Sequence, residues 1–144
     1  MIETQTKLQF KGIDIPIVDF KSVKPISGRH EISVEVVPKV FFSEDSETEF
    51  KVVQNVHVFV EDAFELTVAA IGSFKLSGTP EEPVRTNLIS VNAPAIMFPY
   101  IRAFIATLTA NLGGVIGTLN IPPQFFGALI VSEDAVEDTT NGKL

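Results

Sequence analysis

The sequence predicts an α+β fold, in which a four-stranded antiparallel sheet carries two to three helices on one face. Four segments between residues 7 and 76 alternate apolar and polar residues with the two-residue period of a strand. A helix-start signal at residues 79–82 and an apolar repeat of three and four residues then follow. Strands followed by helices are typical of α+β domains, and 144 residues most simply form a single domain, 1–144.

The first two strands are predicted at residues 7–20 and 30–42. Gly12 fits a bulge that shifts the first pattern, and Pro16, which lacks a backbone donor, places this strand at an edge. The loop at residues 21–29 is long enough to cross the sheet. The same-phase residues after the bulge are Ile13, Ile15 and Ile17, and the second strand alternates Glu31, Ser33 and Glu35 with Ile32, Val34 and Val36.

An acidic turn at residues 43–49 leads into the third strand, 50–60, and a turn at Glu61 and Asp62 leads into the fourth, 63–76. From Val56 onward both faces of these strands are largely apolar. An antiparallel sheet with one face in water should alternate more cleanly. We therefore expect one face to pack on helices and part of the other on another subunit.

The helical region is predicted to begin at Thr79 as N-cap, with Pro80 at the first helical position and Glu82 where a capping box has a carboxylate. This helix should run to about Ser90, restart near Pro94, and kink or start again at Pro99. Gly113 and Gly114 end it. An apolar stripe follows Pro99 and is predicted to lie on the sheet or on a partner subunit; it comprises Ile101, Phe104, Ile105, Leu108 and Leu112, the first four being the candidate oligomer interface.

Residues 115–123 form an apolar loop, which is unusual because loops generally face water. Such a loop is either pinned to the protein or offered to a ligand. A short apolar helix from Gln124 to about Val131 and a disordered acidic tail, about 133–144, are predicted after it.

A membrane span is the alternative interpretation of the long apolar stretch, in which Arg102 is the only charge between Ala93 and Gly117. Two prolines, a charge near the bilayer centre and a glycine-rich end argue against membrane insertion. We expect Arg102 instead to pair with a carboxylate across a helix interface.

Composition excludes several function classes. The net charge of −7 is opposite to that of a protein that binds nucleic-acid backbones. With no Cys and two His, neither a metal site nor a cofactor is expected. His57 and His30 are the candidate bases, but no nucleophile accompanies them, so catalysis is not expected. The first residues lack a signal-peptide pattern, which predicts a cytoplasmic protein.

Two strings resemble the SecB family of export chaperones. Residues 94–102, Pro-Ala-Ile-Met-Phe-Pro-Tyr-Ile-Arg, resemble the family's Asn-Ile-Leu-Phe-Pro-Tyr-Ala-Arg at the start of its first long helix. Residues 119–129, Leu-Asn-Ile-Pro-Pro-Gln-Phe-Phe-Gly-Ala-Leu, resemble its Leu-Asn-Leu-Ala-Pro-Val-Asn-Phe-Asp-Ala-Leu. Residues 68–76 are similar to the family's last strand.

The resemblance implies a cytoplasmic homotetramer, a dimer of dimers, that holds unfolded preproteins in apolar grooves and delivers them to the SecA translocation motor for protein export. The family's SecA-docking positions fall on Ile17, Lys21, Glu65 and Thr67, where its charge pattern is not kept. The implied client-binding groove comprises Ile32, Val34, Val36, Ile116, Leu119, Ile121, Phe126 and Leu129.

Two alternatives remain beside an export holdase. One is a SecB-like chaperone dedicated to another client, such as an antitoxin. The other is a structural assembly subunit that uses the same apolar surface for one fixed partner.

Overall fold

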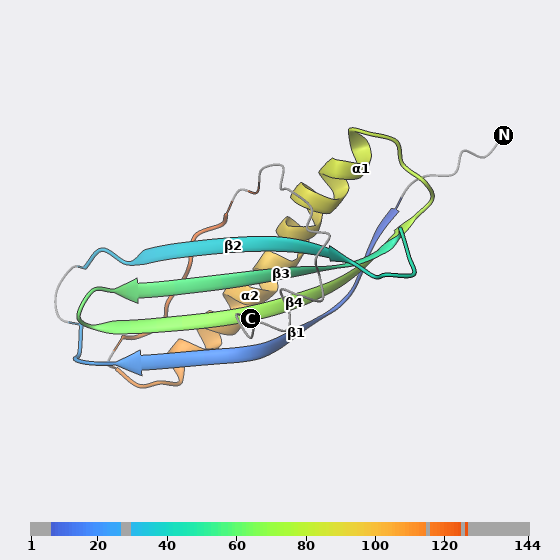
Figure 1. Cartoon of the computed structure of the whole chain (residues 1–144). Helices are drawn as coiled ribbons and strands as arrows, with labels where there is room; N and C mark the ends of the chain where they lie inside the picture. Colours follow the sequence, from blue (N-terminus) through green and yellow to red (C-terminus); the bar gives the residue numbers. More distant parts are fainter. Residues whose placement is uncertain (1–6, 27–29, 115, 125, 127–144) are drawn as a thin grey trace.

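The computed structural model describes residues 7–26, 30–114, 116–124 and 126. Its four antiparallel strands, β1 (Lys7–Ser22), β2 (Ser33–Phe42), β3 (Glu49–Val60) and β4 (Phe64–Ser77), form one sheet in the order β1-β4-β3-β2. A helical run crosses one face of the sheet (Figure 1), and it consists of α1 (Val84–Asn87), the π-helical turn η1 (Leu88–Asn92) and α2 (Ala93–Ala110). The predicted α+β class is confirmed. The helices predicted between Thr79 and Leu112 are consecutive parts of this single run, whereas Gln124 and Phe126, the described residues of the last predicted helix, have no regular secondary structure.

The strand order places β1 and β2 at opposite edges of the sheet, although they follow each other in the chain. The intervening loop therefore joins the two edges, as predicted. Its first residue, Val23, donates its backbone N–H to the carbonyl of Ala63 in the β3–β4 turn at 2.7 Å. Pro16 lies on an edge strand, where its missing donor costs no hydrogen bond to a second neighbouring strand.

β1 is irregular at two places. The predicted bulge is present at Gly12, whose φ of +141° suits glycine, and a second register shift follows between Asp14 and Ile17. Ile13 therefore lies opposite Gly72, whereas Ile17 lies opposite Ala69. Side chains alternate between the two faces along β4, and Gly72 and Ala69 are an odd number of residues apart, so they lie on opposite faces. The prediction that Ile13, Ile15 and Ile17 share one phase is therefore wrong. The cause lies at Pro16, which cannot donate to the ladder.

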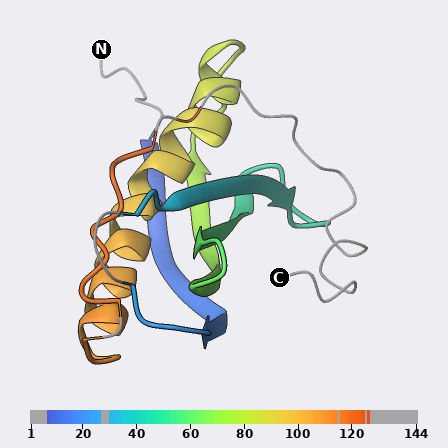
Figure 2. The ribbon, with the colours of Figure 1, turned by 90° about the vertical axis from the view of Figure 1, so that its left-hand side faces the viewer.

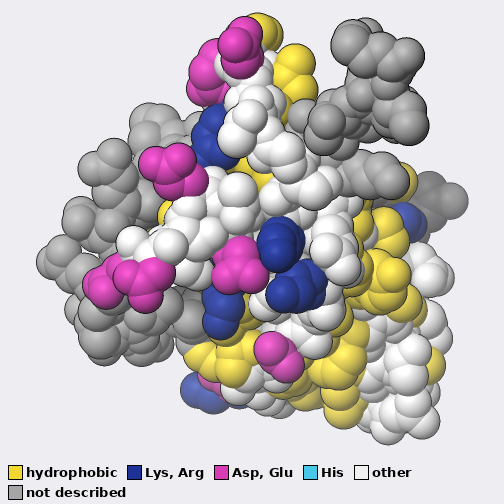
Figure 3. Space-filling model, turned by 90° about the vertical axis from the view of Figure 1, so that its right-hand side faces the viewer, with side chains coloured by type: hydrophobic (Ala, Val, Ile, Leu, Met, Phe, Trp, Pro, Cys, Tyr) yellow, Lys and Arg dark blue, Asp and Glu magenta, His cyan; other side chains and the backbone are white. Residues whose placement is uncertain are grey.

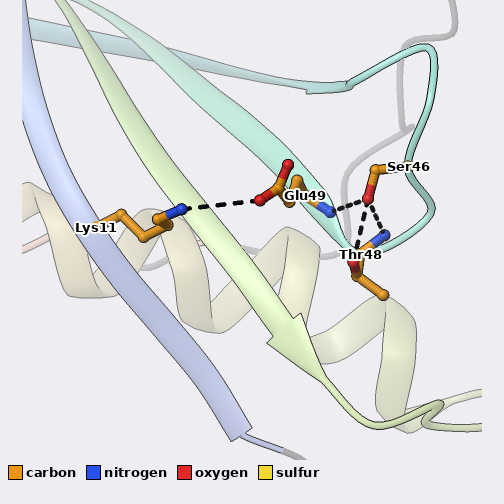
Figure 4. Close-up of polar contacts among 4 residues, drawn as sticks. All are labelled: Lys11, Ser46, Thr48 and Glu49. Carbon is orange, nitrogen blue, oxygen red and sulfur yellow. Dashed lines mark hydrogen bonds and ion pairs between the residues drawn. The ribbon is translucent and has the colours of Figure 1, made fainter.

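Ser46 organises the acidic β2–β3 hairpin (Figure 4). Its hydroxyl oxygen accepts the backbone N–H groups of Thr48 at 3.1 Å and Glu49 at 3.0 Å. The Glu49 carboxylate lies 3.7 Å from the Lys11 ammonium on β1. Arg85 of α1 also reaches this hairpin, since it donates to the carbonyl of Glu47 at 3.0 Å. At this end of the sheet, cationic and acidic side chains lie side by side (Figure 3).

The prediction that the first helix begins at Thr79 is wrong, because α1 begins at Val84. A residue that precedes a proline is disfavoured in helical conformation, and two prolines, Pro80 and Pro83, follow each other closely here. Glu82 still supports the helix start, since its carboxylate accepts the backbone N–H of Thr86 at 2.8 Å and also the Thr86 hydroxyl. These two hydrogen bonds, of which the one from the Thr86 hydroxyl has the larger effect, hold the pKa of the Glu82 carboxyl below its usual value.

The predicted helix restarts at Pro94 and Pro99 are also wrong, because the helical run continues from Val84 to Ala110. The alternative of a kink at Pro99 stays a prediction. Pro94 lies in the first turn of α2, directly after the wider η1 turn, where a missing N–H is tolerated. The helix ends three residues before Gly113, whose φ is +92°. By length and composition the run could cross a membrane, but core helices pass the same test, and its apolar stripe packs on the sheet.

α2 approaches the sheet closely over Gly72 of β4. A Cβ atom at Gly72 would lie 2.8 Å from Met97 Sδ and 2.9 Å from the Phe74 ring, so the absence of a side chain permits this approach. Beside it, the buried Gln54 amide donates to the carbonyl of Pro94 at 3.0 Å. The helix residues buried over these contacts are Ala93, Pro94, Met97, Phe98, Ile101, Ile105 and Thr109.

We expect Gly72→Val to destabilise the fold by about 1–3 kcal/mol, because the added atoms force Met97 and Phe74 to move in a packed core. Urea unfolding of the purified protein measures this change. Gly114→Ala is the matched control, since a Cβ at Gly114 meets no atom within 4 Å. Equal stability of both variants would contradict the packing described.

Candidate binding surface

An extended segment without regular secondary structure, residues 116–124, follows the helix and runs back beside α2 (Figure 2). Two hydrogen bonds fix it to the helix. The Leu119 N–H donates to the Thr109 hydroxyl oxygen at 2.8 Å, and Arg102 Nε donates to the carbonyl of Ile121 at 2.6 Å. The Thr109 hydroxyl in turn donates to the carbonyl of Ile105 at 2.7 Å. The described part of the predicted apolar loop, residues 116–123, is therefore pinned to the protein.

The apolar side chains of the segment, together with Phe126 just after it, are of two kinds. Leu119 and Ile121 are 5% and 3% exposed and belong to the core. Ile116 and Phe126 are half-buried and pack against its margin. The Phe126 ring meets Phe98 of α2 edge to face, with 5.8 Å between ring centroids.

Strand β2 supplies the second part of this margin. Val34 and Val36 lie opposite Val58 and Val56 of β3, on the side of the sheet that the helix covers. Both are half-buried because β2 is an edge strand. We call the four half-buried side chains the apolar rim: Val34, Val36, Ile116 and Phe126.

Of the eight residues predicted for the groove, the structure brings six into one apolar cluster. These are the apolar rim together with Leu119 and Ile121. Ile32 precedes β2 and is 44% exposed. Leu129, and all but Gln124 and Phe126 of the predicted short helix, lie outside the described residues, as does the predicted acidic tail.

The four predicted oligomer-interface residues differ in burial. Ile101 and Ile105 are fully buried against the sheet, so they offer no surface to another chain. Phe104 and Leu108 are half-buried, and their role at an interface stays a prediction. The outer face of α2 carries Ile96, Tyr100, Ala103 and Thr107 among its exposed residues, and none of these is charged. These residues are not among the predicted interface residues, which follow the strongest apolar stripe; the signal in the sequence is the near absence of charge around the whole helix.

His57, the candidate base, lies on the face of the sheet opposite the helix. Its Nδ1 is 3.7 Å from Glu35 of β2, and its Nε2 is 3.5 Å from Glu65 of β4. The imidazole stacks on Phe59 with 4.6 Å between centroids. In the described part of the chain, no group of three or more His, Cys, Asp or Glu could hold a metal ion.

Arg102 lies on the flank of α2 that faces the segment. Within the described ranges its hydrogen-bond partner is the carbonyl of Ile121, whereas a carboxylate had been expected. Arg102 also lines an open depression of about 250 Å³. The other residues of this depression are Pro99, Ala103, Ala106, Asn120 and Ile121.

Comparison with known proteins gives one family and several similar structures, of which two are described. The model of the family SecB, preprotein translocase subunit SecB, matches residues 18–134. The fold is similar to that of the Mycobacterium tuberculosis SecB-like chaperone Rv1957, solved with a ChAD peptide from the Rv1956 HigA1 antitoxin. The TM-score is 0.64 and the identity 17%, over 81% of this chain and 87% of that chain.

A protein of unknown function from Streptococcus agalactiae is also similar, with a TM-score of 0.49 and 11% identity over 83% of this chain and 99% of that one. No curated protein sequence matches the chain.

We expect Thr109→Val to loosen the segment, because the variant keeps the shape of the side chain but leaves the buried Leu119 N–H without its acceptor. The cost should be about 1–3 kcal/mol in urea unfolding, with faster amide hydrogen exchange at Leu119. Thr109→Ser retains the hydroxyl and serves as the control. If the two variants exchange at the same rate, the hydroxyl does not hold the segment.

Proposed function

Because the chain belongs to the SecB family of preprotein translocase subunits, we propose that it is a chaperone, a holdase that binds unfolded polypeptides and keeps them competent for translocation. The observation that carries the proposal is the apolar rim on a strongly acidic protein. Half-buried apolar side chains at the margin of the core give an unfolded chain a surface against which to bury its own apolar side chains.

The physical basis of binding is burial of apolar surface, which yields about 25 cal/mol per Å² without any sequence code. β2 adds a second source of affinity, because its outer edge has no strand partner among the described residues. An extended client can pair its backbone with such an edge while alternate side chains contact Val34 and Val36. The net charge of −7 keeps the loaded complex soluble and favours basic clients.

Delivery for protein export is the finer part of the proposal, and the face of the sheet opposite the helix bears on it. The positions that the family resemblance assigns to SecA docking lie on β1 and β4, where Lys21 lies directly opposite Glu65. A lysine opposite a glutamate reduces the acidity of that face. This favours, as a second candidate, a chaperone dedicated to another client such as an antitoxin, the client class of the similar M. tuberculosis protein.

We further propose a cytoplasmic homotetramer built as a dimer of dimers. Its support is the outer face of α2, where Ile96 and Tyr100 are 38% and 53% exposed. Exposed apolar side chains beside the small Ala103 allow two helices to approach closely. No catalytic residue and no cofactor form part of the proposal.

Phe126→Glu and Val36→Glu should each reduce protection of a reduced, unfolded client against aggregation several-fold, because a carboxylate in the apolar rim disfavours apolar contacts. Light scattering at equal molar ratios of protein and client measures protection. Val23→Glu is the matched control, since Val23 is 78% exposed and lies outside the rim.

Wild-type protein that gives no protection would refute the holdase. Wild-type protection of one client only, with no binding to unrelated unfolded chains, would identify a dedicated chaperone or an assembly subunit with one partner. Full protection by both rim variants would place the binding surface elsewhere.

The protein should have a solution mass of about four times the 15.7 kDa of the chain. Tyr100→Glu should shift the mass to a dimer or monomer, because charge on an uncharged helix face opposes close packing. Light scattering coupled to size exclusion measures the mass, and Val23→Glu again serves as the control. A monomeric wild-type protein would overturn the tetramer.

A further inference from the structure

Arg102 is isolated from any opposite charge along the chain. Between residues 86 and 132 it is the only charged side chain. It is half-buried, and within the described ranges no carboxylate lies within 4 Å of it. A half-buried guanidinium gains from pairing with a carboxylate, and none of the described residues supplies one, so a bound polypeptide can do so.

The geometry leaves the charge available. The bond to the carbonyl of Ile121 uses Nε, which is one of five N–H donors of the guanidinium. The other four are on the two terminal nitrogens, whose edge matches the two oxygens of a carboxylate. Because Nε is fixed on the segment, the plane of the guanidinium is oriented before any ligand binds.

The surroundings favour an organic carboxylate over a free inorganic anion. Pro99, Ala103 and Ala106 form an apolar wall of the depression, while the exposed Asn120 adds a neutral hydrogen-bonding amide. Neutral walls around a single cation fit one negative charge carried on an apolar chain. The depression adjoins Ile121, a member of the same apolar cluster as the rim.

We propose that Arg102 is a carboxylate-binding site for bound polypeptide, which anchors one Asp, Glu or C-terminal carboxylate of an otherwise apolar client segment. The site deepens the proposed holdase function and rests on it. Burial of apolar surface alone does not fix which part of a client lies at which part of the surface. The pairing of Arg102 with one carboxylate fixes that alignment. The outer face proposed for self-association meets this site at Ala103, but its test residue Tyr100, two residues from Arg102, projects from nearly the opposite side of the helix.

The test uses the full-length protein and three synthetic peptides with the same apolar sequence. The first has one central Glu and an amidated C-terminus, the second has Gln in its place, and the third is the Gln peptide with a free C-terminal carboxylate. Fluorescence anisotropy at low salt gives the dissociation constants. We expect the wild-type protein to bind the first or the third about ten-fold more tightly than the second, which distinguishes a side-chain from a terminal carboxylate.

Arg102→Gln should reduce this affinity ratio to about one. Arg102→Lys should retain part of it, because lysine keeps the positive charge but not the paired N–H donors of the planar guanidinium. Asn120→Asp provides an independent variant outside the helix, since it places a carboxylate in the depression and should also lower the ratio. A wild-type ratio of one, or a ratio unchanged in both Arg102→Gln and Asn120→Asp, overturns the site.

Three outcomes separate this site from its alternatives. If Arg102→Gln lowers the solution mass, the carboxylate belongs to a neighbouring subunit, and the proposal is wrong. If the wild-type protein binds all three peptides with equal dissociation constants, the holdase proposal is supported and the carboxylate site is refuted. If none of the peptides binds, both fall.

Discussion

The close approach of α2 to the sheet at Gly72 is the constraint on which the rest of the structure depends. Met97 occupies the space above this glycine, and the Gln54 amide fixes the carbonyl of Pro94 one turn away. With the helix axis held there, Thr109 and Arg102 come to lie on the flank where the chain returns. The two hydrogen bonds that pin residues 116–124 therefore follow from a contact between a strand and a helix.

The strands could be predicted from the sequence because burial imposes a two-residue period on them, and Gly12 and Pro16 marked the irregular edge strand. The helix start could not, since Thr79, Pro80 and Glu82 match a capping pattern locally, and only the second proline displaces it. The continuity of the helix through Pro94 depends on the π-helical turn before it, and no residue type in the sequence predicts such a turn.

The candidate surface could be predicted as a set of residues but not as a surface. Leu119 in the segment and Phe126 just after it are both large apolar residues, and nothing in the sequence distinguishes them. The hydrogen bond between the Leu119 N–H and Thr109 directs the Leu119 side chain into the core, whereas Phe126 stays at its margin against Phe98. That distinction arises from tertiary contacts, as does the choice of a backbone carbonyl as partner for Arg102.

The strand order has a consequence for biosynthesis. β1 has β4 as its neighbour, and Lys7 pairs with Ser77, so the first strand has no partner until the fourth has left the ribosome. Contacts so distant in sequence slow folding and leave apolar strands exposed meanwhile. During its own synthesis the chain thus spends time as an unfolded polypeptide with exposed Val and Ile side chains, the same kind of molecule that we propose it holds.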